Sequence, residues 1–236
     1  MLKVEAPGGA RDILLHACCA PCSGAILECL RDSGIRPVVF FSNSNIYPRA
    51  EYDLRLSEMQ RYADKMGVEL VSDEYDHDAW LAAIRGLERE PERGERCAAC
   101  FRFRLDRAAR YAAFRGLPVL ATTLASSRWK DLDQVNAAGL DACSGRVDPC
   151  KTVATHGFVN GRGPLTQSVG GMSAEREVLQ GSSPAAQAAV VFWAQNWRKG
   201  GLQPRRNEII REQGFYNQTW CGCEFSRNQR EDLPEQ

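Results

Sequence analysis

The stretch that decides the fold is residues 13–30, which read ILLHACCAPCSGAILECL. Residues 13–15 form a short apolar run of the kind that makes a buried strand. A turn rich in cysteine follows directly, and residues 25–30 then place apolar side chains at helical spacing. A strand that passes through a short turn into a helix is the repeating unit of a parallel α/β sheet.

The same alternation continues along the chain, since apolar strand-like runs at residues 37–41, 68–71, 119–122 and 190–193 are separated by helix-like stretches. The helices are expected at residues 49–66, 77–87, 97–114, 131–138 and 203–213, with caps and glycines near their ends. We therefore predict an α/β, Rossmann-like fold with a mostly parallel sheet of about five strands flanked by helices.

The domain organisation follows from length and composition. The chain has 236 residues, of which 44% are hydrophobic and 25% charged, as is usual for a globular domain and unlike a disordered chain. The stretch at about residues 141–187 is rich in Gly, Ser and Pro and interrupts the alternation. We predict a single α/β catalytic domain, residues 1–236, with an insertion at about 141–187.

Charge and hydropathy narrow the possible partners. Lys and Arg number 30 and Asp and Glu number 30, so the net charge is zero and a basic coat for nucleic acid is absent. A local basic cleft remains compatible with this balance. No apolar run approaches the ~20 residues that span a bilayer, and residues 1–11 contain no apolar signal core. We expect a cytoplasmic protein with no membrane partner.

The ten cysteines are the unusual feature of the composition. A chain without an export signal keeps its thiols reduced, and clustered thiols then bind metal or perform redox chemistry. One zinc ion or one four-iron cluster uses four ligands, so a larger set permits a cluster and a second metal. Seven cysteines are clustered: Cys18, Cys19 and Cys22; Cys97 and Cys100; Cys221 and Cys223.

Two expectations concern the geometry of these thiols. Cys18 and Cys19 are adjacent, so their side chains should diverge and serve two neighbouring metals more readily than one. Thiols near a helix start should have a lowered pKa, because the backbone amides there stabilise a thiolate. Cys29 falls on an apolar helical face and is expected in the core, while Cys143 and Cys150 are interpreted as incidental.

Polar side chains follow the predicted strands where each strand ends. In parallel α/β sheets, ligands bind beyond the carboxyl ends of the strands, so a metal site and a substrate site are expected at this edge. The candidate substrate-binding residues are Asn43, Asn45, Tyr47, Thr122, Thr123, Ser126, Lys130, Arg198 and Lys199.

Six segments of the chain resemble segments of one protein family, and they occur in the order that the family has. The chain resembles the QueH-type epoxyqueuosine reductases, and the similarity covers most of the chain except the insertion. The segments are HACCAPC (16–22), SNSNIYPRAEY (42–52), RCAACFRFRL (96–105), ATTLASSRWK (121–130), WRKGG (197–201) and YNQTWCGCEFS (216–226).

The resemblance implies an oxidoreductase that converts epoxyqueuosine to queuosine at the wobble position of a tRNA anticodon loop. It also implies a four-iron, four-sulfur (4Fe-4S) cluster with an additional iron ion beside it, held by ligands from the seven clustered cysteines. Because some relatives carry aspartate at the place of Cys22, that residue is assigned to the lone iron. The division of the other ligands stays open.

The implied reduction of epoxyqueuosine to queuosine requires electrons and protons. The chain carries no GxGxxG fingerprint for a nicotinamide or flavin cofactor, so an external one-electron donor is expected to supply the cluster. Tyr47, Asp131 and Tyr216 are unranked candidates for the proton donor.

Several side chains are candidates for contact with the RNA. Arg102 and Arg104 lie two residues apart on a helix, so at most one of them should face the site. The aromatic side chains that could stack a base are Tyr47, Trp129, Trp197 and Trp220.

Three other functions remain open. A zinc-binding RNA-binding module would use the same cysteines without redox chemistry. A cluster-dependent tRNA-sulfurating enzyme should carry an SGGxDS loop after the first strand, where this chain has a cysteine-rich turn. A dithiol oxidoreductase needs fewer clustered thiols.

Overall fold

The computed structural model describes residues 2–144 and 189–226. Its centre is one five-stranded sheet in which every neighbouring pair is parallel, in the order β3-β2-β1-β4-β5. The predicted α/β fold with a parallel sheet is confirmed. The strands are β1 (Asp12–His16), β2 (Arg36–Phe41), β3 (Leu70–Ser72), β4 (Val119–Thr122) and β5 (Val191–Phe192).

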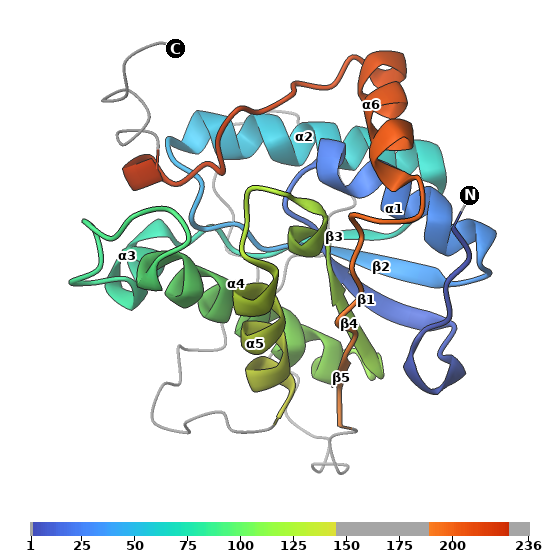
Figure 1. Ribbon diagram of the computed structural model, residues 1–236, viewed down its shortest axis with the longest axis horizontal. Coiled ribbons are helices and arrows are strands. Elements are labelled where there is room, and N and C mark those ends of the chain that lie inside the picture. Colours follow the sequence, from blue (N-terminus) through green and yellow to red (C-terminus); the bar gives the residue numbers. More distant parts are fainter. Residues whose placement is uncertain (1, 145–188, 227–236) are drawn as a thin grey trace, which may run out of the picture.

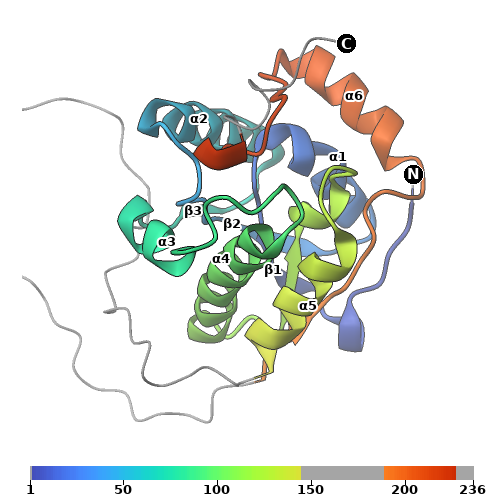
Figure 2. The same ribbon diagram turned by 60° about the vertical axis from the view of Figure 1, so that its left-hand side comes forward.

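Helices cover both faces of the sheet (Figure 1). One face carries α1 (Ala20–Asp32), α2 (Arg49–Met66) and α6 (Leu202–Gln213), with α6 packed on α1. The other face carries α3 (His77–Ala83), α4 (Glu95–Phe114) and α5 (Leu132–Cys143), with α4 packed on α5, as the turned view in Figure 2 also shows. Short 3-10 turns cover Pro7–Gly9 and Thr123–Ser126.

The central strand, β1, carries consecutive apolar residues, with no alternation of apolar and polar side chains. Ile13, Leu14 and Leu15 of β1 are fully buried because helices cover both faces of that strand. A second apolar cluster surrounds Trp80 and includes Cys100 and Cys223. This second cluster joins the start of α4 to the C-terminal segment of the described chain.

The order of the strands places a crevice beside β1. The chain leaves β1 through α1 toward β2, and it reaches β4, the other neighbour of β1, only after β3. This reversal is the topological switch point at which open α/β sheets bind ligands. The backbone N–H of Cys18 after β1 donates to the hydroxyl of Thr123 after β4, at 3.1 Å.

The predicted boundaries were wrong at three helices. α1 begins at Ala20 and not at residue 25, because Pro21 favours the first turn of a helix and Cys19 is the N-cap. α3 ends at Ala83, four residues before the predicted end. α5 continues to Cys143, so it includes the first residues of the predicted insertion.

The remainder of the predicted insertion, residues 145–187, lies outside the described residues, as does Cys150. The interpretation as one domain with an insertion stays a prediction. Among the described helices, none combines the length and the hydrophobicity that crossing a bilayer requires.

Candidate metal centre

All seven clustered cysteines line one pocket with a volume of about 820 Å³. They reach it from three parts of the chain: the turn after β1, the first turns of α4 and the segment that follows α6. The pocket lies at the carboxyl ends of β1 and β4, the position that the topology favours for a ligand.

The first group of thiols is compact. The sulfur atoms of Cys18, Cys19 and Cys22 all lie within 4.8 Å of one another, and among the described residues these three form a group able to hold a metal ion. The Sγ atoms of Cys18 and Cys19 are 3.8 Å apart, so the expected divergence of these neighbours was wrong. Because α1 starts at Ala20, its first turn brings Cys22 over the same spot.

The pKa values of the three thiols in this first group shift in different directions. Hydrogen bonds from Cys19 and Cys22 lower the pKa of Cys18 well below its usual value. Hydrogen bonds with Cys18 and Cys22, followed by burial, raise the pKa of Cys19. The hydrogen bond to Cys18, followed by burial, raises the pKa of Cys22 to about 11. Because thiols bind metal as thiolates, a metal ion that binds here displaces protons, and its affinity should depend on pH.

The second group joins α4 to the C-terminal segment. Burial, and next to it the thiols of Cys100 and Cys221, raise the pKa of Cys97 to about 11. A hydrogen bond with Cys221 and burial raise the pKa of Cys223. The expected lowering at helix starts was therefore wrong for Cys22 and Cys97, because burial and neighbouring thiols outweigh the backbone amides.

Lys130 connects the two groups electrostatically. A hydrogen bond from Cys223 lowers the pKa of Cys221 well below its usual value. Burial acts to raise this pKa, and the positive charge of Lys130 lowers it further. Burial acts to lower the pKa of Lys130, but the negative charges of Cys221 and Cys18 outweigh it, so the pKa is raised. The charge of one cation therefore acts on a cysteine of each group.

The C-terminal segment is held in place by α2. Arg55 is buried, pairs with Glu51 at 2.6 Å and donates to the carbonyl oxygens of Cys221 at 3.1 Å and Trp220 at 3.4 Å. The backbone N–H of Tyr47 donates to the carbonyl oxygen of Gly222 at 2.9 Å. These contacts fix the turn that presents Cys221 and Cys223 to the pocket.

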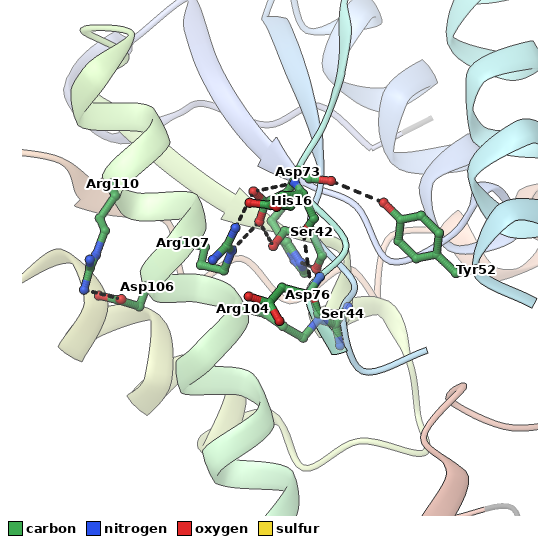
Figure 3. Close-up of polar contacts among 11 residues, drawn as sticks. His16, Ser42, Ser44, Tyr52, Asp73, Asp76, Arg104, Asp106, Arg107 and Arg110 are labelled. Carbon is green, nitrogen blue, oxygen red and sulfur yellow. Dashed lines mark hydrogen bonds and ion pairs between the residues drawn. The ribbon is translucent and has the colours of Figure 1, made fainter. Parts of the chain in front are cut away.

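Polar side chains at the ends of β1 and β2 are buried and hydrogen-bonded to Arg104, which lines the pocket, and we call this group the floor; Figure 3 shows its members His16, Ser42 and Arg104. His16 Nε2 donates to the carbonyl oxygen of Ser42 at 3.1 Å, so Nδ1 accepts from the hydroxyl of Thr122 at 2.8 Å. Burial, with the nearby Arg104 guanidinium, lowers the pKa of His16 to about 3. The imidazole is therefore neutral.

Arg104 completes the floor. Its guanidinium donates to the carbonyl oxygen of Ser42 at 3.3 Å and to Oδ1 of Asn43. It lines the pocket, whereas Arg102 is exposed and is not among the lining residues. Only one of the two therefore faces the site, as predicted.

Four of the predicted substrate residues line the pocket and five do not. The lining residues are Asn45, Ser126, Lys130 and Arg198. Asn43, Thr122 and Thr123 are buried and engaged in the hydrogen bonds of the floor and the cysteine turn. Tyr47 is half exposed and stacks on His77, and Lys199 is exposed.

The candidates for base stacking and for proton donation also differ in whether they line the pocket. Trp129 and Trp220 line the pocket, while Trp197 is fully buried in the core. Asp131 lines the pocket but caps α5, where its carboxylate accepts from the backbone N–H groups of Asp133 and Gln134. Tyr47 and Tyr216 are not among the lining residues.

Four arginines that line the pocket were not singled out from the sequence: Arg55, Arg93, Arg96 and Arg206. Arg96 carries a local signal, because it adjoins Cys97 at the start of a predicted helix. The others have none, since their place in the pocket depends on contacts with distant segments.

The comparisons with known proteins agree along most of the chain. The family model described as "Epoxyqueuosine reductase QueH" matches residues 13–154 and 171–229. A protein of that name from Histophilus somni is 37% identical over 224 residues, covering 95% of this chain and 75% of the relative. Its counterpart from Haemophilus influenzae is 36% identical over 224 residues, with the same coverage.

The counterpart from Acinetobacter baylyi is 36% identical over 225 residues, covering 95% of this chain and 84% of the relative. The family match includes the segments that carry all seven clustered cysteines. The chain therefore belongs to the epoxyqueuosine reductase QueH family.

Proposed function

We propose that the cysteine-lined pocket is where epoxyqueuosine in tRNA is reduced to queuosine, and that its seven thiolates hold two iron centres. As a member of its family, the chain is an oxidoreductase of tRNA modification that converts epoxyqueuosine to queuosine. The observation that carries the proposal is the meeting of seven thiols from three distant segments on one pocket at the switch point of the sheet.

The cysteines divide into two ligand sets. Cys97, Cys100, Cys221 and Cys223 supply the four thiolates that a 4Fe-4S cluster requires. The thiols of Cys100 and Cys221 help to raise the pKa of both Cys97 and Cys223, and Cys100 and Cys223 share one apolar cluster.

The compact trio of Cys18, Cys19 and Cys22 holds the additional iron. Three protein ligands leave a coordination position open, as catalytic metal sites do. The trio contains Cys22, the residue that the family resemblance assigns to the lone iron.

The electrostatics of the pocket fit an anionic thiolate-held cluster. Lys130 lines the pocket, and its charge interacts with thiols of both sets. Among the described residues, Arg104 donates to uncharged acceptors alone, so its buried charge is also free to offset thiolates. The donor set and the cations around it therefore match the group that the family implies.

The reaction removes the epoxide oxygen as water and leaves an alkene, which consumes two electrons and two protons. When bound, the iron centres supply single electrons and an electron-pair acceptor for the oxygen. We propose that the electrons come from an external one-electron donor, and that the reaction takes place in the cytoplasm with tRNA as the partner.

The chain's own residues position the substrate. Oδ1 of Asn45 is buried, lines the pocket and has no hydrogen-bond partner among the described residues, so it can accept from a substrate O–H or N–H. Trp129 and Trp220 offer aromatic faces for nucleobases, while Arg128, Arg198 and Arg206 offer charges for phosphates. All five of these residues line the pocket.

Anaerobic iron and acid-labile sulfide analysis tests the proposal. The wild type should hold about five irons and four sulfides per chain, and it should convert epoxyqueuosine tRNA when dithionite supplies electrons. Zinc without sulfide after anaerobic reconstitution would contradict the proposal and favour a zinc-binding RNA module.

Single variants test the division of ligands. Cys19→Ser should lose about one iron and keep its sulfide, whereas Cys100→Ser should lose most of its sulfide. Cys143→Ser is the matched control, because Cys143 lies at the end of α5 outside the pocket. Equal losses in Cys19→Ser and Cys100→Ser would overturn the division.

A further inference from the structure

Arg96 is a fully buried cation in the wall of the pocket, with 1% of its surface exposed. It lies in the first turn of α4, directly before Cys97. Its Nη1 donates to the carbonyl oxygen of Glu88 at 2.7 Å, and its guanidinium lies over the ring of Phe225, 5.6 Å from the centroid. These contacts hold the side chain in one orientation.

The other donors of Arg96 are unused. Its Nε and Nη2 atoms are buried and have no hydrogen-bond acceptor among the described residues. Two other arginines with buried or half-buried side chains differ in this respect, because Arg55 pairs with the carboxylate of Glu51 and Arg107 pairs with that of Asp73. A buried charge with unpaired donors is strongly destabilising unless an anionic acceptor is present. The pocket that Arg96 lines also contains Cys97 and Cys100.

We propose that Arg96 donates hydrogen bonds from Nε and Nη2 to the anionic cluster held by Cys97, Cys100, Cys221 and Cys223, and thereby raises its reduction potential. This inference rests on the proposed function, because it requires a cluster at these cysteines. Each one-electron reduction by the external donor adds a negative charge to the cluster, so a fixed cation and its hydrogen bonds stabilise the reduced form more than the oxidised form. Arg96 then helps the cluster accept the electrons that the epoxide consumes.

The direct test is the reduction potential of the purified holoprotein, measured by a dithionite titration followed by electron paramagnetic resonance. Arg96→Met keeps an unbranched side chain of similar length and removes the charge and the donors. We expect reduction to become about tenfold less favourable, which corresponds to a potential lower by ~59 mV for one electron. Arg96→Lys keeps a positive charge but lacks the planar guanidinium. Its reduction potential should therefore lie between those of the wild type and Arg96→Met.

Arg102→Met is the matched control. It removes a cation from the same helix, at an exposed position that does not line the pocket. The potential of this variant should equal that of the wild type. Equal potentials in the wild type and Arg96→Met, with full iron and sulfide in both, would overturn the inference.

A second measurement separates a cluster contact from a purely structural role. In metal-free protein, Nε and Nη2 of Arg96 have no acceptor among the described residues, so Arg96→Met should leave the thermal unfolding midpoint unchanged or raise it. In the loaded protein the same change should lower the midpoint. A variant that folds without metal but no longer retains the cluster would also support the contact. Equal shifts in both forms would contradict it.

Failure of this inference differs from failure of the proposed function. If the wild type binds no cluster in the iron and sulfide analysis, the proposed function fails. If the wild type binds its cluster and only the Arg96 effects are absent, the proposed function stands and this inference fails.

Discussion

The backbone N–H of Arg93 donates a hydrogen bond to the sulfur of Cys97, at 3.3 Å. Arg93 has φ = 69° and is the only non-glycine residue in the described part of the chain with a positive φ. Its guanidinium donates to the carbonyl oxygens of Arg128 at 3.3 Å and Trp129 at 3.0 Å. One residue with a strained backbone therefore joins a candidate ligand thiol to the rim of the pocket.

Replacement of Arg93 should separate its backbone strain from its side-chain contacts. Arg93→Gly removes the strain and keeps the N–H that faces Cys97, whereas Arg93→Ala keeps the strain. We expect the glycine variant to have the higher free energy of unfolding by about 1 kcal/mol, measured by urea denaturation. An alanine variant as stable as the glycine variant would show that the left-handed conformation is not retained in solution.

Trp129 should act on substrate binding and not on the chemical step. Its side chain is 60% exposed, lines the pocket and lies beside the Arg128 guanidinium. Because stacking of a base on an aromatic ring contributes about 1–3 kcal/mol, Trp129→Ala should raise KM for tRNA about tenfold with kcat almost unchanged. Steady-state kinetics with epoxyqueuosine tRNA measure this effect.

Trp129→Phe is the conservative control and should retain most of the binding, since it keeps an aromatic face. Phe114→Ala removes an aromatic side chain that is 73% exposed at the end of α4, outside the pocket, and should leave KM unchanged. A fall in kcat without a change in KM for Trp129→Ala would contradict a stacking role.

The fold could be predicted because its signals are local. Apolar runs, caps and glycines lie within the elements that they specify, and the prediction of α2 from Arg49 to Met66 agrees with the structure at both ends. The early start of α1 was missed because the cysteine turn conceals an N-cap at Cys19 followed by a helix-favouring Pro21.

The cysteines of the site could be found because clustered thiols are rare, but its supporting residues could not. Arg55 reaches Cys221 across 166 positions of sequence, and no local pattern indicates that contact. Asn43 and Asn45 look alike in sequence, yet Asn43 donates to the carbonyl oxygen of Ala17 while Oδ1 of Asn45 stays without a partner among the described residues. Which asparagine faces the substrate depends on tertiary hydrogen bonds that spacing does not encode.

Gly222 should be required for the second ligand set. It has φ = 98°, and a Cβ atom placed there would lie 2.8 Å from Ile46 and 3.2 Å from Arg55. Gly222→Ala should therefore displace Cys221 and Cys223, and sulfide content should fall while far-UV circular dichroism of the folded chain persists. Gly8→Ala is the matched control, because Gly8 also has a positive φ, has no atom within 4 Å of an added Cβ, and is not among the residues that line the pocket. Full sulfide content in Gly222→Ala would contradict this prediction.

Asp73 should contribute more to stability than an exposed ion pair of the same geometry. Its buried carboxylate accepts from Nη2 of Arg107 at 2.8 Å and from the hydroxyl of Ser42 at 2.6 Å, as Figure 3 shows. Asp73→Asn leaves the Arg107 charge without its partner, so the free energy of unfolding should fall by about 3 kcal/mol. Asp12→Asn breaks the two-point pair with Arg36 on the surface and should have little effect. Similar losses in both variants would contradict the importance of burial.

Tyr62 should make the attachment of the C-terminal segment sensitive to alkaline pH. Its ring packs edge-on against Phe215 at 5.4 Å, and burial, with the nearby Glu28 carboxylate, raises the pKa of Tyr62 to about 12. The unfolded chain loses this proton near pH 10, so between about pH 10 and 12 the folded state binds more protons than the unfolded state. Stability from this residue is then complete below pH 10 and falls as the pH rises, by up to about 1.4 kcal/mol per pH unit.

Tyr62→Phe removes the ionisable group and keeps the packing, so its unfolding free energy should match that of the wild type at pH 8 and exceed it at pH 11. Parallel curves across this range would show that Tyr62 ionises equally in both states, and the contact that leads the chain toward Cys221 would then be insensitive to pH.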